Sequence, residues 1–194
     1  MEKFSRKERI ALVIFGMILL AIIIQMIWRL GEFSSPSGGI IVKEAEPDLS
    51  RNLLKPGDVK MTASSHNHDN QVVDKLIDNN GRSFWHIASD EVGGTAWVTV
   101  DFGEGNRKAV GSMMALPRHD LPRQSFRTAE LFGSNNGEDW ELVSEIRLGR
   151  APEKAAWIKW KFVNDRAWRY YRLLITDGHE GDKFYSMAEL ALFE

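Results

Sequence analysis

The stretch LIDNNGRSFWH, residues 76–86, concentrates oxygen and nitrogen donors within a few positions. Asp78, Asn80 and Ser83 offer carboxylate, amide and hydroxyl oxygens, and Gly81 permits a turn that directs backbone carbonyls inward. A hard cation such as calcium takes about six to eight oxygen ligands, many of them backbone carbonyls. One carboxylate supplies little charge for a tight site, so the residues alone favour a solvated turn, with calcium as the alternative.

Residues suited to catalysis are scattered rather than grouped. Cysteine is absent, which excludes disulfides, thiolate zinc sites and a Cys nucleophile. Two of the five histidines, His66 and His68, lie close to Asp69, but no third ligand is identifiable in the sequence. No nucleophile elbow, zinc-binding helix motif or phosphate-binding Gly loop is present, so we expect no enzymatic activity.

The elements that must position these residues are short and β-like. Eight runs with strand-like patterning lie between turn residues, and WVTVDF and WIKWKF alternate apolar and polar residues as half-buried strands do. The runs cover residues 59–64, 95–103, 109–116, 127–134, 140–148, 155–163, 169–176 and 187–194. Only QVVDKLID, residues 71–78, is briefly helical in pattern. The sequence therefore predicts an all-β antiparallel sandwich.

The N-terminal part has a different character. Residues 10–28 form an apolar run of about 19 residues, which spans ~28 Å as a helix and matches a bilayer core. Basic residues concentrate in positions 1–9, so the positive-inside rule places the N-terminus in the cytoplasm. The run is longer than a signal-peptide core and lacks a small-residue cleavage site, which makes a cleaved signal the less favoured alternative. We expect a transmembrane helix over 10–28, a linker over 29–51 and a periplasmic or extracellular domain over 52–194.

Six ordered motifs in the outer part resemble the discoidin-like, coagulation factor V/VIII C-type (F5/8 type C) family, and are closest to its family 32 carbohydrate-binding modules. They are TASS at 62–65, LIDNNGRSFWH at 76–86, WVTVDFG at 97–103, SNNGEDWELV at 134–143, RYYRLLI at 169–175 and MAELALFE at 187–194. The resemblance implies a galactose-binding-like jelly-roll β-sandwich whose loops at one end bind a ligand without catalysis.

The resemblance also supplies the second acid that the turn lacks. In many members this loop coordinates calcium together with a Glu from the last strand, which matches Glu189. The implied ligands are the side chains of Asp78, Ser83 and Glu189, with backbone oxygens near Leu76, Asn80 and Ala188. This sequence departs from the family at Asn79, where Gly is usual, and at Ser83, where Thr is usual. Both changes keep the needed backbone freedom or hydroxyl.

A sugar site is implied by two further pieces, FWH at 84–86 and LPRHDLPRQ at 116–124. His86 and Arg118 match the residues that hold a galactose-type sugar, Asp120 completes the P-R-x-D motif, and Phe184 or Tyr185 would supply a late aromatic. Sugar hydroxyls need paired polar partners, and the apolar ring face stacks on an aromatic side chain. The family's Asn is replaced near Gln124 or Ser125, and Ser89 stands where galactose binders often have a second Trp, so the sugar is not specified.

Together these features predict a membrane-anchored, calcium-stabilised, non-catalytic glycan-binding module at the cell envelope. The formal charge of −2 gives no reason to expect a nucleic-acid partner. The alternative is a structural subunit that docks on another envelope protein through the same sandwich. A glycan binder should expose His86, Arg118 and an aromatic residue together at an open loop end, whereas a docking subunit should fill that end or show an apolar patch elsewhere.

Overall fold

The computed structural model describes residues 40–43, 47–87, 95–179 and 184–194, all of which belong to one compact unit, Ser37–Glu194. Within these ranges no helix is long and apolar enough to cross a membrane. The transmembrane helix expected over 10–28 lies outside the described residues.

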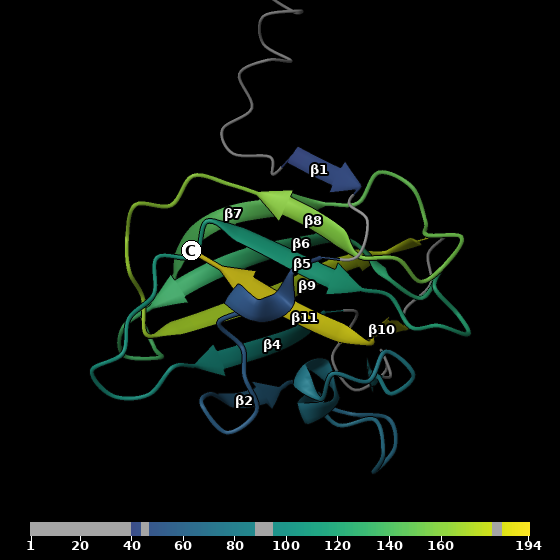
Figure 1. Ribbon diagram of the computed structural model, residues 1–194, viewed down its shortest axis with the longest axis horizontal. Coiled ribbons are helices and arrows are strands. Elements are labelled where there is room, and N and C mark those ends of the chain that lie inside the picture. The colour runs from purple at the N-terminus through teal and green to yellow at the C-terminus, as the bar shows by residue number, and fades with distance from the viewer. Residues whose placement is uncertain (1–39, 44–46, 88–94, 180–183) are drawn as a thin grey trace, which may run out of the picture. The chain divides into compact units, whose positions relative to one another are not determined.

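Antiparallel strands form two sheets and one short strand pair (Figure 1). The first sheet has the order β2-β4-β9-β6-β7, the second has the order β1-β8-β5-β11, and β3 pairs with β10. The strands are β1 (Ile40–Lys43), β2 (Lys60–Ala63), β3 (Trp85–Ile87), β4 (Ala96–Asp101), β5 (Ser112–Leu116), β6 (Phe126–Ser134), β7 (Glu141–Arg147), β8 (Ile158–Lys161), β9 (Tyr170–Gly178), β10 (Tyr185–Met187) and β11 (Glu189–Phe193), and the 3-10 helices are η1 (Leu49–Arg51) and η2 (Val73–Ile77). The prediction of an all-β sandwich is confirmed.

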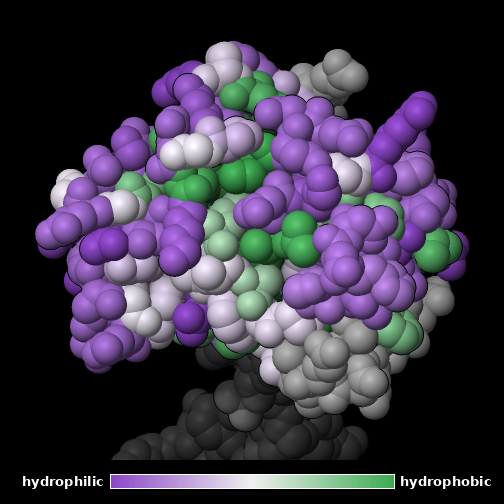
Figure 2. Space-filling model, turned by 90° about the horizontal axis from the view of Figure 1, so that it is seen from below, coloured by the Kyte–Doolittle hydropathy of each residue, from purple (hydrophilic) through white to green (hydrophobic). Residues whose placement is uncertain are grey.

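The core lies between the two larger sheets because alternate residues of each strand face inward. Val98 and Val100 of β4 are buried on one side, and Met113 of β5 and Trp160 of β8 on the other. The Trp160 ring packs against Phe126 with their centroids 5.6 Å apart. Seen from below Figure 1, hydrophobic side chains gather near the middle of the face and hydrophilic ones border them (Figure 2).

Two buried residues, Tyr171 of β9 and Gly133 of β6, stand opposite each other in the five-stranded sheet. The Tyr171 hydroxyl donates to the Lys108 carbonyl at 2.7 Å and accepts from the Val110 amide at 3.1 Å, and Asn164 also donates to it at 3.2 Å. Gly133 of β6 passes directly beneath the indole of Trp168, where an added Cβ would lie 2.4 Å from ring carbon Cδ1. Loss of the Tyr171 hydroxyl, or addition of a side chain at Gly133, should therefore reduce the stability of the fold.

The structure differs from the predicted organisation in the segment before the domain. β1 lies inside the expected linker, residues 29–51, and pairs with β8 at the edge of the second sheet. η1 also falls within that range. The IIV run that forms β1 is apolar enough for a strand, but the Gly- and Ser-rich segment before it favoured the interpretation as a linker. The brief helical pattern of residues 71–78 is confirmed as η2.

Candidate functional site

The turn after η2 is held by its own polar side chains. The Ser83 hydroxyl lies 2.9 and 2.7 Å from the two carboxylate oxygens of Asp78, and the amide of Asn80 donates to Asp78 Oδ1 at 3.0 Å. Lys75 approaches the same carboxylate at 3.4 Å. Asn79 adopts the left-handed conformation with φ 58°, which Asn tolerates better than most residues. Asn79 therefore performs the backbone role that Gly has in the resembling family.

Glu189, the first residue of β11, brings a second carboxylate to this turn. Its side chain is buried, and burial followed by repulsion from Asp78 raises the pKa of Glu189 to about 7. The backbone amides of Asn80 and Asn79 act in the opposite direction. Oxygen Oε1 of Glu189 has no hydrogen-bond partner among the described residues. A buried carboxylate that lies near a second acid and has an unpaired oxygen is unfavourable without a cation.

The donor set fits calcium rather than a transition metal. The described residues contain no cluster of three or more His, Asp or Glu side chains placed to hold a metal ion. A site here must therefore draw on two carboxylates, the Ser83 hydroxyl and backbone carbonyls, which is the oxygen-rich mixture that calcium accepts. Leu76 and Ala188, whose carbonyls the family resemblance implies as ligands, are fully buried on η2 and between β10 and β11.

The residues nominated for sugar binding form one stacked cluster. The Arg118 guanidinium lies 3.8 Å from the centroid of the Phe84 ring. Phe84 meets the His86 ring edge-on at 6.5 Å, and His86 lies 5.6 Å from the Phe184 ring. The pairing of β3 with β10 brings these residues together, because His86 stands opposite Ser186 in register.

The guanidinium of Arg118 is ordered by two acceptors. Its Nε and Nη2 donate to the two oxygens of Asp120 at 2.7 Å each, and Nη1 donates to Gln124 at 3.0 Å. The same hydrogen bonds from Arg118 lower the pKa of Asp120 to about 2. Since a guanidinium carries five N–H donors, two remain beyond these three bonds for a ligand. Asp120 therefore positions Arg118 rather than acting alone.

The structure places the two aromatics nominated for ligand contact differently. Tyr185 is 3% exposed and belongs to the core, because in β10 it stands opposite Ile87, which is fully buried. Phe184, just before the strand, is 43% exposed and is the aromatic that contacts His86. Adjacent positions of an extended chain face opposite sides, so only one of the two aromatics can reach the site.

The loop end is less open than a glycan site was expected to be. His86 is 5% exposed and Arg118 is 9% exposed, although they converge with Phe184 as expected. Ser89, which replaces a second Trp of galactose binders, lies outside the described residues.

Sequence reasoning passed over two members of the cluster. Phe84 was noted only as part of the FWH motif, yet the Arg118 guanidinium stacks on its ring. Gln124 was noted only as a replacement for Asn, but its side chain accepts from Arg118 and its backbone carbonyl accepts from the Ser186 amide at 2.8 Å. The spacing between Phe84 and His86 could have identified Phe84, because residues two apart in an extended segment share a face.

A hollow of about 320 Å³ adjoins both the turn and the cluster. Its lining is polar except for the ring of Phe84, and consists of Asn70, Gln71, Lys75, Asn80, Arg82, Ser83 and Phe84. The amide and hydroxyl groups of this lining are the kind of partners that sugar hydroxyls take. The turn thus contributes to a surface concavity.

Known structures share this architecture. CpGH89CBM32-5 of Clostridium perfringens, solved in complex with GalNAc-β-1,3-galactose, is 23% identical, with a TM-score of 0.60 over 71% of this chain and 96% of that one. The family 32 carbohydrate-binding module of Clostridium perfringens NanJ, solved with galactose, is 22% identical, with a TM-score of 0.57 over 71% and 94%. The C-terminal domain of a Bacteroides fragilis chitobiase is 21% identical, with a TM-score of 0.57 over 72% and 95%. The fold is therefore the galactose-binding-like β-sandwich of family 32 modules.

Residues 60–190 match the model of the F5/8 type C domain, and the chain belongs to this family. The resemblance drawn from the six motifs is confirmed. No curated protein matches the chain.

Proposed function

We propose that this protein is a non-catalytic glycan-binding module that acts at the cell envelope. The observation that carries the proposal is the cluster in which Arg118, Phe84, His86 and Phe184 stack on one another at one end of the sandwich. Membership of the F5/8 type C family supports it, as do structural neighbours solved with galactose and with GalNAc-β-1,3-galactose.

The chemistry of the cluster suits a pyranose ring. Phe184 offers an exposed ring for the apolar face of a sugar, and Arg118 keeps two N–H donors beyond its bonds to Asp120 and Gln124. Because Asp120 and Phe84 already fix the guanidinium, a sugar hydroxyl meets a donor that loses little freedom on binding. Such a site orients a glycan without reacting with it.

Titration of the full-length protein in micelles of a non-sugar neutral detergent tests this proposal. A glycan array identifies the ligands, and isothermal titration measures their affinity. Phe184→Ala should weaken binding about tenfold, the loss expected for one stacking contact of ~1.4 kcal/mol. Leu142→Ala is the matched control, since Leu142 is also an exposed hydrophobic residue but lies on β7 of the five-stranded sheet. A flat response to every glycan on the array contradicts the proposal.

Calcium is proposed as the structural partner of this module. The paired carboxylates of Asp78 and Glu189, with the unpaired oxygen of Glu189, support it. Asp78, Ser83 and Glu189 would hold the ion with carbonyls near Leu76, Asn80 and Ala188, and the ion would supply positive charge that ties the turn to β11. Calcium should raise the melting temperature of the protein, and Asp78→Ala should abolish that rise.

We propose that residues 10–28 anchor the module in a membrane, with residues 1–9 in the cytoplasm and the sandwich periplasmic or extracellular. The apolar length of the run and the basic residues before it support this topology. A tether of this kind raises the local concentration of a weak binder near its target. Protease added to intact cells or spheroplasts should cleave the C-terminal domain and leave the N-terminus protected.

One observation favours docking on a protein as a second candidate function. His86 and Arg118 are almost fully buried at the loop end, as expected if that end is filled rather than open. Purification from the native membrane in mild detergent separates the two functions. A stoichiometric protein partner that Phe184→Ala releases favours docking, whereas a protein purified alone that retains glycan affinity favours glycan binding.

A further inference from the structure

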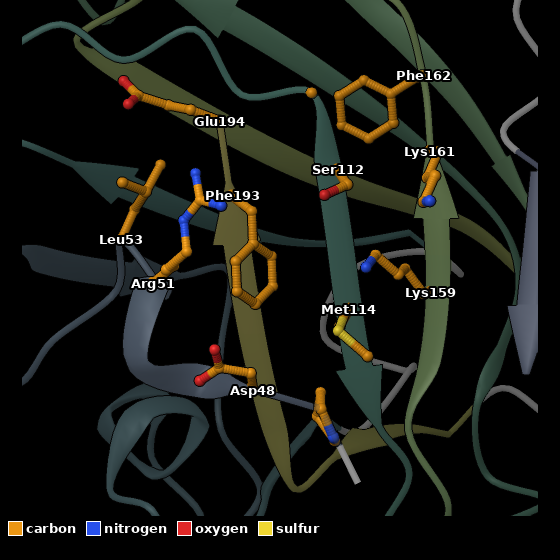
Figure 3. A pocket seen from close by; sticks show the side chains of 12 residues that line it. Asp48, Arg51, Leu53, Ser112, Met114, Lys159, Lys161, Phe162, Phe193 and Glu194 are labelled. Carbon is orange, nitrogen blue, oxygen red and sulfur yellow. The ribbon is translucent and has the colours of Figure 1, made fainter. Parts of the chain in front are cut away.

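We propose that the outer face of the four-stranded sheet carries a second binding site, for a sugar that bears a carboxylate. This site goes beyond the proposed function and does not depend on the loop end. It is a hollow of about 620 Å³ between η1 and strands β5, β8 and β11 (Figure 3). That volume lies within the range of about 300 to 1,000 Å³ typical of small-ligand sites.

The strand register builds the site from one cross-strand row. Phe193 of β11, Ser112 of β5 and Lys161 of β8 stand opposite one another on neighbouring strands. Met114 and Lys159 form the next row on the same face, two residues along their strands. The residues between these rows face the core, so the outer face gathers two lysines, a hydroxyl and a ring.

Three cations border the hollow. Lys159 and Lys161 lie two residues apart on one face of β8, and η1 contributes Arg51. Like charges on adjacent positions of a sheet face repel each other, and an anion between them removes that repulsion. No ion pair joins Lys161 to an acid within the described part of the chain.

Two acids, Asp48 and Glu194, also line the hollow. The Asp48 carboxylate accepts from the Ser50 amide at 2.9 Å. The hydrogen bonds from Ser50, and after them the charge of Arg51, lower the pKa of Asp48. Glu194 lies at the exposed end of β11. Asp48 and Glu194 lie on the η1 and β11 side of the hollow, whereas Lys159 and Lys161 lie on β8 (Figure 3). The β8 side of the lining is therefore the cationic side, and the acids remain available as acceptors for sugar hydroxyls.

Aromatic rings make the site suited to a sugar rather than to a bare anion. Phe162 and Phe193 line it, and Nζ of Lys159 lies 6.0 Å from the centroid of the Phe193 ring. Figure 3 shows Arg51 and Lys159 on either side of Phe193 in this view. The floor is closed, because Met114 is 1% exposed. A pyranose could stack on Phe193 while its carboxylate meets the flanking cations.

The new site is separate from the loop-end cluster along the same strand. Ser112 begins β5, whereas Arg118 follows two residues after the end of that strand. Five strand residues span about 17 Å at ~3.3 Å each, so the two sites lie toward opposite ends of the sheet. A module with both sites could hold one polysaccharide at two places, which strengthens binding without a new contact at either.

The test is isothermal titration of the full-length protein with a hyaluronan tetrasaccharide, in which glucuronate alternates with N-acetylglucosamine. The uncharged chitin tetrasaccharide is the matched ligand. We expect binding of the acidic tetrasaccharide at least tenfold tighter than of the neutral one, and weaker binding as salt rises from 50 to 500 mM. Lys161→Gln and Phe193→Ala should each weaken it about fivefold or more, and Lys60→Gln on β2 should not.

Several results overturn the proposal. Equal affinity for the acidic and neutral tetrasaccharides removes the role of the carboxylate. Displacement by millimolar inorganic phosphate, or equal binding to phosphatidylglycerol vesicles, indicates a general anion or lipid surface. Binding that falls in Phe184→Ala but not in Lys161→Gln places the tetrasaccharide at the loop end. If Phe193→Ala fails to fold, Lys161→Gln and Lys159→Gln decide the question, because both residues are on the surface.

Discussion

Replacing Glu189 by Gln should stabilise the metal-free protein at pH 8 and should abolish the stabilisation that calcium gives. In the absence of a cation the ionised carboxylate of Glu189 is buried beside that of Asp78, and one of its oxygens lacks a partner. Gln has nearly the same shape and no charge. The substitution therefore removes an electrostatic cost in the metal-free protein and removes a ligand from the calcium-loaded one.

The size of the first effect follows from the pKa of Glu189, which burial raises from 4.5 to about 7. At about 1.4 kcal/mol per unit, this shift corresponds to a cost of about 3 kcal/mol once the group is ionised in both states. The sign is set by the raised pKa of an acid, because the folded protein holds a proton that the unfolded chain has released. With chelator present, the contribution of Glu189 to stability should therefore be greatest below pH 4.5 and should fall as pH rises through 7.

Calcium should reverse this dependence. A cation bound between Asp78 and Glu189 favours the ionised carboxylates, so its stabilisation is largest at high pH and is lost when they are protonated. Calcium at one hundred times its Kd stabilises the folded state by about 2.7 kcal/mol. At pH 8 this nearly offsets the cost that the metal-free protein carries.

Urea or thermal unfolding of the full-length protein at pH 5 and pH 8, with calcium or with chelator, measures both effects. In chelator, Glu189→Gln should not show the decline in stability between pH 5 and pH 8 that the parent protein shows. Adding calcium should not stabilise the variant. Glu138→Gln is the control, because Glu138 is an exposed acid in a turn. A Glu189→Gln variant that keeps the parent's pH dependence in chelator would refute the argument, and one that is still stabilised by calcium would remove Glu189 from the site.

Three further changes probe the site and its support. Asp120→Asn should weaken glycan binding about tenfold, because Arg118 loses the acceptor that positions it. Since the pKa of Asp120 is lowered to about 2, the parent should lose stability as pH falls from 4 through 2, and Asp120→Asn should not show that loss when melting is measured against pH. Gly133→Ala should destabilise the fold by about 2 kcal/mol in urea unfolding, because the new methyl collides with Trp168. Tyr171→Phe should cost about 1 to 3 kcal/mol in the same assay, because buried partners of its hydroxyl lose their hydrogen bonds.

The sequence predicted the strands well because their patterns are local. Alternation in WVTVDF and WIKWKF is decided within each run, and both became strands with one face in the core. The choice between Phe184 and Tyr185 was not local. It depends on how β10 pairs with β3, which fixes which of two neighbouring aromatics faces the core, and no periodicity in a three-residue strand encodes that register.

The pairing of Asp78 with Glu189 shows the same limit more strongly. The single carboxylate of the turn indicated that a calcium site would need a second acid, but only the family resemblance identified a residue so far away in the chain. The sequence could not predict the burial of Arg118 either, because that burial depends on the stacking of Arg118 on Phe84 and its hydrogen bonds to Asp120. Local composition identified the polar groups, whereas their partners and exposure were set by contacts between distant strands.

The proposed cation site and the proposed ligand cluster are connected through the β3–β10 pair, but different measurements separate their contributions. The turn that holds Asp78 ends next to Phe84, and Glu189 follows β10 by two residues, so the same pair of strands joins both places. A cation that joins the turn to β11 would therefore also hold the strand pair that carries His86, without contacting a bound sugar. A change at Glu189 should alter melting and, through positioning, affinity, whereas Phe184→Ala should alter affinity alone, since its exposed ring supports little of the fold.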